Sequence, residues 1–371
     1  MNILAAPNSF KNSLSATDAA TAIIKGLQES RLRGNATPFP IGDGGDGTGD
    51  LLIKKLGAAI IETPARDPLG RERATYFGLV SATSTAIIEM ANASGLRLLG
   101  KAELDPLHAS SAGTGDLIRA ALDKKARHII IGMGGSATVD GGVGILTALG
   151  VRFPAGTIDT TGLDPRLAST KLTVLCDVAN PLLGREGAAA VFGPQKGASP
   201  QVVQQLEAAL RQLANNIQKT TGKEIAALPS GGAAGGAAAG LYGVLGASLV
   251  NGIDYFLQLT GFDQALQETQ LVLTGEGSID EQTLQGKAPF GVALRAKKQG
   301  IPVIGIAGRL PQTANPGLDE YFDALFPINH DALRLQDALH HTSANLTATA
   351  RAIGNLLALH GSPRGLLARQ Q

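Results

Sequence analysis

The sequence contains very little cysteine and no tryptophan, and these absences limit its class. Cys176 is the single cysteine among 371 residues. One cysteine cannot form a disulfide within the chain, and no group of Cys and His has the spacing of a zinc site. Such a composition is typical of a reducing compartment. We therefore expect a cytoplasmic protein.

The chain also lacks an excess of charge of either sign. Lysine and arginine together number 32, and aspartate and glutamate number 31. Nothing therefore predicts a basic face that would neutralise a nucleic-acid backbone. Aromatic residues make up 4% of the chain, which argues against a platform for stacking sugars or bases. We expect small-molecule partners and no nucleic acid, and homo-oligomerisation stays open.

No segment predicts secretion or a membrane partner. Residues 1–7 lack the basic region, apolar stretch and cleavage site of a secretory signal. Residues 231–252 carry no charge and are long enough to cross a bilayer, but they are mostly glycine and alanine. Such small side chains contribute little transfer free energy. We expect a glycine loop that leads into a buried helix.

Hydrophobic periodicity predicts an α/β protein of more than one domain. Residues 2–6 form a short apolar strand, and a helix with a start signal at Ser15 and Asp18 follows. Residues 58–93 contain short strand-like runs separated by turns, which predicts an antiparallel meander. Further elements are predicted as helices at 201–220 and 289–299 and as strands at 271–273, 303–306 and 324–326.

A chain of this length exceeds one typical core of about 100–200 residues, so two domains are expected. We predict one α/β domain formed by both chain ends, residues 1–58 and 285–371, and a central α/β domain with the meander, residues 59–284. A cleft between two domains is a common place for a small-molecule site.

The common catalytic signatures are missing. Gly286-Lys287 is followed by Ala288, and position 281 is glutamate where a P-loop begins with glycine, so there is no Walker A motif. The sequence has no G-x-S-x-G and no H-E-x-x-H motif, which argues against a serine hydrolase or zinc peptidase.

Glycine is abundant instead, with 48 residues that gather in loops carrying an acid or a lysine. Clustered glycine lets the backbone approach a ligand closely. The loops are Gly42–Thr48, Gly134–Gly142, Cys176–Leu182, Phe192–Ala198 and Thr274–Asp280.

Together with Asn8-Ser9-Phe10-Lys11 and Gly286-Lys287, these loops resemble the bacterial glycerate kinase family (type 1, glycerate 2-kinase-like), in the same order and over nearly the whole chain. Relatives commonly have aspartate where this chain has Asn8, and glutamate where it has Asp46. The loop at 229–236 also differs from the family's usual glycine loop.

The resemblance implies a flavodoxin-like (Rossmann-like) domain and a mixed-sheet α/β domain, with the active site in the cleft between them. It also implies ATP-dependent phosphorylation of D-glycerate in organic acid catabolism, with the 2-hydroxyl as acceptor and 2-phosphoglycerate as product. ATP and Mg²⁺ are the implied cofactors.

Phosphoryl transfer needs cations and amides to hold phosphates, carboxylates for magnesium, and a group that accepts the proton of the acceptor hydroxyl. Asp177 follows the apolar strand 172–175 and is predicted as the group that orients or deprotonates this hydroxyl. Lys11 and Lys196 complete the predicted catalytic set, because they lie in short polar or glycine loops. Glu276 and Asp280 are the predicted metal ligands.

A further group of loop residues is predicted to bind substrate or phosphate. Ser136 and Thr138 lie between a strand and the helix at 142–149, where free amides and the helix dipole favour an anion. The predicted set is Ser9, Asp43, Ser136, Thr138, Asn180 and Lys287. An aspartate in a glycine loop can also merely cap a turn.

Two other functions stay open at this point. One is a kinase for another small hydroxy acid, which would differ only in its pocket contacts. The other is a nucleotide or metabolite sensor without catalysis, which the loss of a carboxylate at Asn8 suggests.

Overall fold

The chain folds into two compact units. The structure is a computed structural model that describes residues 1–329 and 334–360. Unit 1 comprises Met1–Gly42 and Phe256–Gln371, and unit 2 comprises Asp43–Tyr255. Both chain ends belong to unit 1. The units divide after Gly42 and Tyr255, where the sequence suggested 58 and 284, and residues 271–273 pair with the N-terminal strand of unit 1.

Unit 1 contains a parallel sheet with the strand order β11-β10-β9-β1-β2. The interior strands β1, β9 and β10 are largely buried, as expected for a parallel sheet that is covered on both faces, whereas the edge strand β2 is largely exposed. The strands of unit 1 are β1 (Asn2–Ala5), β2 (Asn35–Pro38), β9 (Leu271–Ser278), β10 (Val303–Arg309) and β11 (Ala324–Pro327). The chain leaves β1 towards β2 and leaves β9 in the opposite direction towards β10, so the order reverses between β1 and β9.

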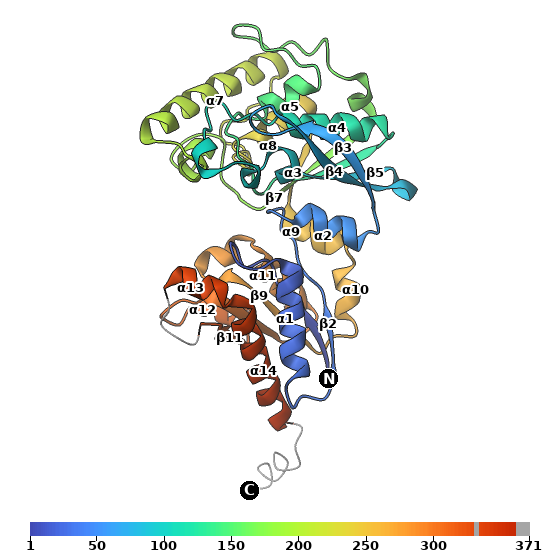
Figure 1. Ribbon diagram of the computed structural model, residues 1–371, viewed down its shortest axis with the longest axis vertical. Coiled ribbons are helices and arrows are strands. Elements are labelled where there is room, and N and C mark those ends of the chain that lie inside the picture. Colours follow the sequence, from blue (N-terminus) through green and yellow to red (C-terminus); the bar gives the residue numbers. More distant parts are fainter. Residues whose placement is uncertain (330–333, 361–371) are drawn as a thin grey trace. The chain divides into compact units, whose positions relative to one another are not determined.

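The helices of unit 1 begin with α1 (Ala16–Gln28), which packs against α14 (Thr342–His360) (Figure 1). The predicted start of α1 is confirmed, since the Ser15 hydroxyl accepts a hydrogen bond from the Asp18 amide at 3.1 Å. The other helices are α10 (Phe262–Leu266), η6 (Glu281–Gln285), α11 (Ala288–Lys298), α12 (Pro316–Asp319) and α13 (Leu335–His340).

Unit 2 contains a mixed sheet with the strand order β3-β4-β5-β6-β7-β8. The predicted meander is confirmed, because β3 pairs antiparallel with β4 and β4 with β5. From β5 to β8 the pairing is parallel. The strands are β3 (Ala59–Arg66), β4 (Glu72–Val80), β5 (Thr85–Glu89), β6 (His128–Gly132), β7 (Lys171–Cys176) and β8 (Ser248–Asn251).

Helices of unit 2 connect these strands and cover the sheet. The α-helices are α2 (Thr48–Lys55), α3 (Ala91–Ser94), α4 (Ala112–Asp123), α5 (Val143–Ala148), α6 (Ala188–Phe192), α7 (Pro200–Thr221) and α8 (Ala237–Leu245), with α9 (Gly252–Leu259) at the boundary of the units. The 3₁₀ helices are η1 (Ser81–Thr83), η2 (Leu96–Leu98), η3 (Lys101–Glu103), η4 (Pro165–Ser169) and η5 (Pro194–Lys196).

The amphipathic helix predicted at 201–220 is confirmed as α7, which buries Leu206, Leu210 and Leu213 against its unit. The glycine-rich stretch from residue 231 leads into the buried helix α8, also as expected. None of the described helices is long and apolar enough to span a membrane. The predicted α/β class with two domains is therefore confirmed.

Candidate functional site

In unit 1 the predicted residues gather at the carboxyl ends of β1 and β9. The two loops are tied together, because the Asn8 amide donates to the Gly275 carbonyl at 2.8 Å. The Thr274 hydroxyl donates to the Ala6 carbonyl, also at 2.8 Å. This edge is the point where the strand order reverses, and open α/β sheets bind ligands at such switch points.

Lys11 and Ser9 occupy the loop after β1. The Ser9 amide donates to the Asn8 side-chain oxygen at 2.8 Å, so the residue that replaces the usual aspartate still orders this loop. Lys11 is exposed in the turn that follows. Its backbone nitrogen lies 3.7 Å from the position that a Cβ on Gly277 would take.

Lys287 is the N-cap residue of α11, with an extended backbone, and its side chain is half-buried. The first turn of α11 has free amides and the positive end of the helix dipole, which favours an anion. Lys287 thus adds a full positive charge where the backbone already favours phosphate.

Glu276 and Asp280 both follow the strand core of β9 but differ in their surroundings. Glu276 is 8% exposed. The Asp280 carboxylate is already engaged, because it accepts from the Gln282 amide at 3.0 Å and caps η6. It also pairs with the Arg309 guanidinium at 3.4 Å. Their role as metal ligands stays a prediction, and Asp280 would have to exchange existing partners.

In unit 2 the loop from Asp43 to Gly47 lies over the carboxyl ends of β6 and β7. The amides of Met133 and Gly134 donate to the Gly44 carbonyl at 3.1 and 3.0 Å. A Cβ on Gly44 would lie 2.9 Å from the Leu175 carbonyl oxygen. Only glycine allows this approach, because Gly44 also has a φ of +94°.

Asp43 and Asp177 border the same glycine. A Cβ on Gly45 would lie 2.9 Å from an Asp43 oxygen and 3.3 Å from an Asp177 oxygen. Asp43 also accepts from the Gly45 amide at 3.1 Å. Both carboxylates are half-buried at the carboxyl edge of the sheet. Sequence spacing alone did not predict that these two loops would meet.

Lys196 is buried, whereas the sequence indicated a cation in an open loop. Its side chain is 3% exposed. The ammonium group donates to the Ser136 hydroxyl and the Thr138 carbonyl, both at 2.8 Å. Burial lowers the pKa of Lys196 to about 7, against the opposing attraction of Asp140. The structure thus brings Lys196 to the predicted Ser136 loop.

The Thr138 and Asn180 side chains differ in their hydrogen bonding. The Thr138 hydroxyl is buried and has no hydrogen-bond partner among the described residues. The Asn180 side chain donates to the Glu186 carbonyl at 2.8 Å and therefore holds its own loop in place. Their roles in substrate binding stay predictions.

Glu89 is a buried acid that the sequence analysis treated only as the end of a strand. It is 0% exposed, and one carboxyl oxygen accepts from the Gly49 amide at 2.6 Å. Burial raises its pKa well above the ordinary value, and Asp46 and Asp50 raise it further. A charged carboxylate at a helix start gains about 0.3–1 kcal/mol, whereas burying an unpaired charge costs several kcal/mol. Burial therefore favours the neutral, protonated form of the Glu89 carboxyl group.

Arg97 was also missed. Its guanidinium donates to the Asn92 side chain and pairs with Asp46 at 3.3 Å. An isolated acid that ends the apolar run Ala86–Ile88 was the available signal for Glu89. Arg97 has no comparable signal, because its position follows from contacts between loops.

Carboxylates suitable for magnesium are present in pairs. No group of three or more His, Cys, Asp or Glu residues that could hold a metal occurs among residues 1–329 and 334–360. Magnesium commonly takes one or two protein carboxylates and completes its shell with water and phosphate oxygens. The predicted ligands Glu276 and Asp280 form one such pair on the β9 loop, and Asp43 and Asp177 at Gly45 form another.

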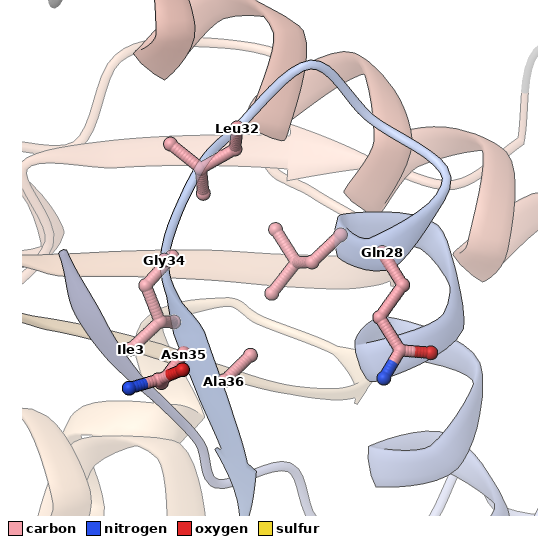
Figure 2. A pocket seen from close by; sticks show the side chains of 7 residues that line it. Ile3, Gln28, Leu32, Gly34, Asn35 and Ala36 are labelled. Carbon is pink, nitrogen blue, oxygen red and sulfur yellow. The ribbon is translucent and has the colours of Figure 1, made fainter.

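A separate hollow in unit 1 does not fit this chemistry. It has a volume of about 220 Å³ and lies between α1 and the start of β2 (Figure 2). Leu27, Leu32 and Ala36 line it together with uncharged polar groups such as Gln28. It lies at the amino ends of β1 and β2, opposite the edge where ligands bind in open α/β sheets.

Comparison with known proteins identifies the family. A model of the glycerate kinase family matches residues 3–358. The chain is 43% identical to a glycerate kinase of Bacillus subtilis (strain 168), over 95% of this chain and 97% of the relative. It is 40% identical to a glycerate 2-kinase of Escherichia coli (strain K12), over 97% and 98%.

The fold agrees with this match. A crystal structure described as glycerate kinase 2 from Salmonella typhimurium LT2 superimposes with a TM-score of 0.79 and 42% identity, over 97% of this chain and 99% of the other. The chain belongs to the glycerate kinase family. The resemblance inferred from the glycine loops is therefore confirmed.

Proposed function

We propose that this protein transfers the γ-phosphoryl group of Mg-ATP to D-glycerate and forms 2-phosphoglycerate. The curated relatives named above support glycerate as the acceptor. The relative from Escherichia coli, named a glycerate 2-kinase, supports the 2-hydroxyl. The observation that carries the proposal is the pair Asp43 and Asp177 on Gly45, because it joins two carboxylates at the ligand-binding edge of a sheet.

In this reaction Asp177 accepts the proton of the attacking hydroxyl. Asp177 is suited to this step because a carboxylate can accept a proton and because it follows β7 at the carboxyl edge of the sheet, where it borders Gly45 together with Asp43. Asp43 orients the loop through its bond to the Gly45 amide. Lys196 holds Ser136 and Thr138, which fixes the loop that we assign to the acceptor.

Lys11 and Lys287 hold the phosphates of ATP in this proposal. Ser9 and the first turn of α11 add hydrogen-bond donors near them. Bound magnesium would neutralise charge on the phosphates, with Glu276 and Asp280 as its proposed protein ligands. Asn180 keeps its assignment to the acceptor. That unit 1 and unit 2 contribute to one cleft stays a prediction.

An enolase-coupled assay tests the proposal. Purified protein with Mg-ATP and D-glycerate should give a signal that requires both substrates, because enolase accepts 2-phosphoglycerate and not 3-phosphoglycerate. ADP release without the enolase signal would move the phosphate to the 3-hydroxyl. The acceptor would be overturned if other hydroxy acids, but not glycerate, released ADP.

A sensor without catalysis is the second candidate, because Asn8 replaces a carboxylate that relatives commonly have. Asn8 is 6% exposed and accepts from the Ser9 amide, as an aspartate also could. If Asn8 removes activity, the protein should bind ATP and glycerate without turnover, and Asn8→Asp should restore turnover. An active wild-type protein excludes this candidate.

A further inference from the structure

Glu89 lies under the loop that carries Asp43 and Asp46. It is the last residue of β5, and it pairs in register with Gly132 at the end of β6. Both strands are interior strands of the unit 2 sheet. The carboxyl ends of these strands carry the candidate site residues of unit 2, so Glu89 is a buried acid directly beside that site.

Two glycines make room for this carboxyl group. A Cβ on Gly49 would lie 2.7 Å from a Glu89 carboxyl oxygen, and a Cβ on Gly132 would lie 3.3 Å from the same oxygen. Contacts under 3.0 Å are not tolerated by real side chains, so any residue larger than glycine at position 49 would displace Glu89. The backbone is therefore shaped around this side chain.

The bond from Gly49 connects Glu89 to the whole acidic loop. Gly49 is the second residue of α2, and the preceding Thr48 hydroxyl accepts from the Gly44 amide at 3.0 Å. Gly44 in turn accepts from the amides after β6. Glu89 thus holds the start of α2 through Gly49, and the start of α2 holds the loop Asp43–Gly47 through the bond between Thr48 and Gly44.

The charges around Glu89 favour the neutral form of its carboxyl group. Asp46 on the loop and Asp50 on α2 are negative, and Asp50 accepts from the Tyr76 hydroxyl of β4 at 2.9 Å. Arg97 in η2 opposes them with one positive charge. The second Glu89 oxygen has no hydrogen-bond partner among the described residues. A charged Glu89 would repel Asp46 and Asp50, and only the Gly49 amide and Arg97 would offset this repulsion.

We propose that Glu89 is a positioning residue that holds the loop Asp43–Gly47 in the arrangement required for phosphoryl transfer. It acts through hydrogen bonding and shape, without a charge and without contact to substrate. The expected change in turnover rests on the proposed function. The expected change in amide exchange of the loop does not depend on it.

Two substitutions separate the hydrogen bond from the charge. Glu89→Gln keeps the length and the oxygen that accepts from Gly49, and it cannot ionise. Glu89→Asp keeps the acid but withdraws the carboxyl group by one methylene. We expect kcat of Glu89→Gln to stay within about threefold of wild type, and kcat of Glu89→Asp to fall by about tenfold or more with little change in KM for ATP.

Hydrogen–deuterium exchange gives the readout that needs no substrate. Amides of residues 43–52 should exchange about tenfold or more faster in Glu89→Asp than in wild type or Glu89→Gln. This measurement still tests whether Glu89 holds the loop if glycerate is not the acceptor. Failure of the proposed function would remove the turnover signal of wild type and leave the exchange difference intact.

Glu207 provides a matched control. One of its oxygens accepts from the Gly184 amide at 3.0 Å, and the other has no partner among the described residues. It lies on α7, outside the candidate site. Glu207→Asp and Glu207→Gln should leave kcat and exchange at 43–52 unchanged.

The inference is overturned by either of two results. Loss of turnover in Glu89→Gln would show that the carboxylate itself takes part in the reaction. Wild-type turnover and exchange in Glu89→Asp would show that the bond to Gly49 does not position the loop.

Discussion

The two units present their candidate cations in different ways. In unit 2, Lys196 is 3% exposed. In unit 1, Lys11 is exposed and Lys287 is half-buried. Buried charges are fixed by packing and respond strongly to protonation, whereas exposed charges are screened by water and salt.

This difference predicts two kinds of mutational effect. Substitutions among the unit 2 residues should change turnover, and often stability, because each buried group has defined partners. Substitutions in unit 1 should mainly change the binding of a charged substrate. The following experiments test this division.

The largest effect is expected for Asp177→Asn in unit 2. The amide cannot accept the proton of the acceptor hydroxyl, so kcat should fall by about a hundredfold or more. Titration calorimetry should find ATP affinity largely intact. Asp159→Asn, which changes an exposed ion pair with Arg152, is the control. Wild-type turnover of Asp177→Asn would remove Asp177 from the role of base.

Lys196→Met tests the buried cation. It removes the bonds to Ser136 and Thr138 and should lower kcat/KM by about tenfold or more. Lys223→Met is the control, because Lys223 also donates to a backbone carbonyl, that of Tyr242, but lies outside the candidate site. Equal losses in both variants would contradict a special role for Lys196.

The same variant predicts a pH dependence of stability. The pKa of Lys196 is lowered to about 7, whereas an unfolded lysine keeps its proton up to about pH 10.4. Between these values the unfolded state binds more protons, so wild-type stability gains a contribution that grows with pH. Urea unfolding at about pH 7 and about pH 9 should show this gain in wild type and not in Lys196→Met.

Lys287→Ala should have a smaller effect, confined to binding. Loss of one charge at the start of α11 should raise KM for ATP by about tenfold, as expected for a hydrogen bond to a charged group, with kcat little changed. Lys297→Ala at the other end of α11 removes an ion pair with Asp323 and is the control. A fall in kcat without a change in KM would contradict the prediction that unit 1 residues mainly affect substrate binding.

The smallest effect is expected for Arg309→Ala. The ion pair with Asp280 is long and exposed, so the free energy of unfolding should change by no more than about 0.5 kcal/mol. Urea unfolding measures this difference, with Arg334→Ala as a second exposed pair for reference. A clearly larger loss would mean that the cap of η6 depends on Arg309.

Much of the fold could be predicted from local sequence patterns. The amphipathic helix α7, the N-cap Ser15 and the meander from β3 to β5 are confirmed, because periodicity and capping act over a few residues. The domain boundaries are harder, since β9 lies more than 260 residues from its partner β1 and no local signal links the two.

The candidate site shows the same limit. Sequence motifs identified the loops of Asp43, Ser136 and Asp177 as candidates, and their roles stay predictions. They did not reveal that Lys196 is buried or that Glu89 lies beneath the acidic loop. Burial and pKa depend on which loops pack together.

The sequence by itself determined the α/β class, the loops that carry chemistry and the family, because these depend on local patterns and on motifs in a fixed order. Only the tertiary structure decided that Asp43 and Asp177 both border Gly45, that Lys196 donates to Ser136, and that Glu89 is buried against Gly49. Each of these facts depends on the desolvation and close approach of residues far apart in the chain, and local sequence does not encode either.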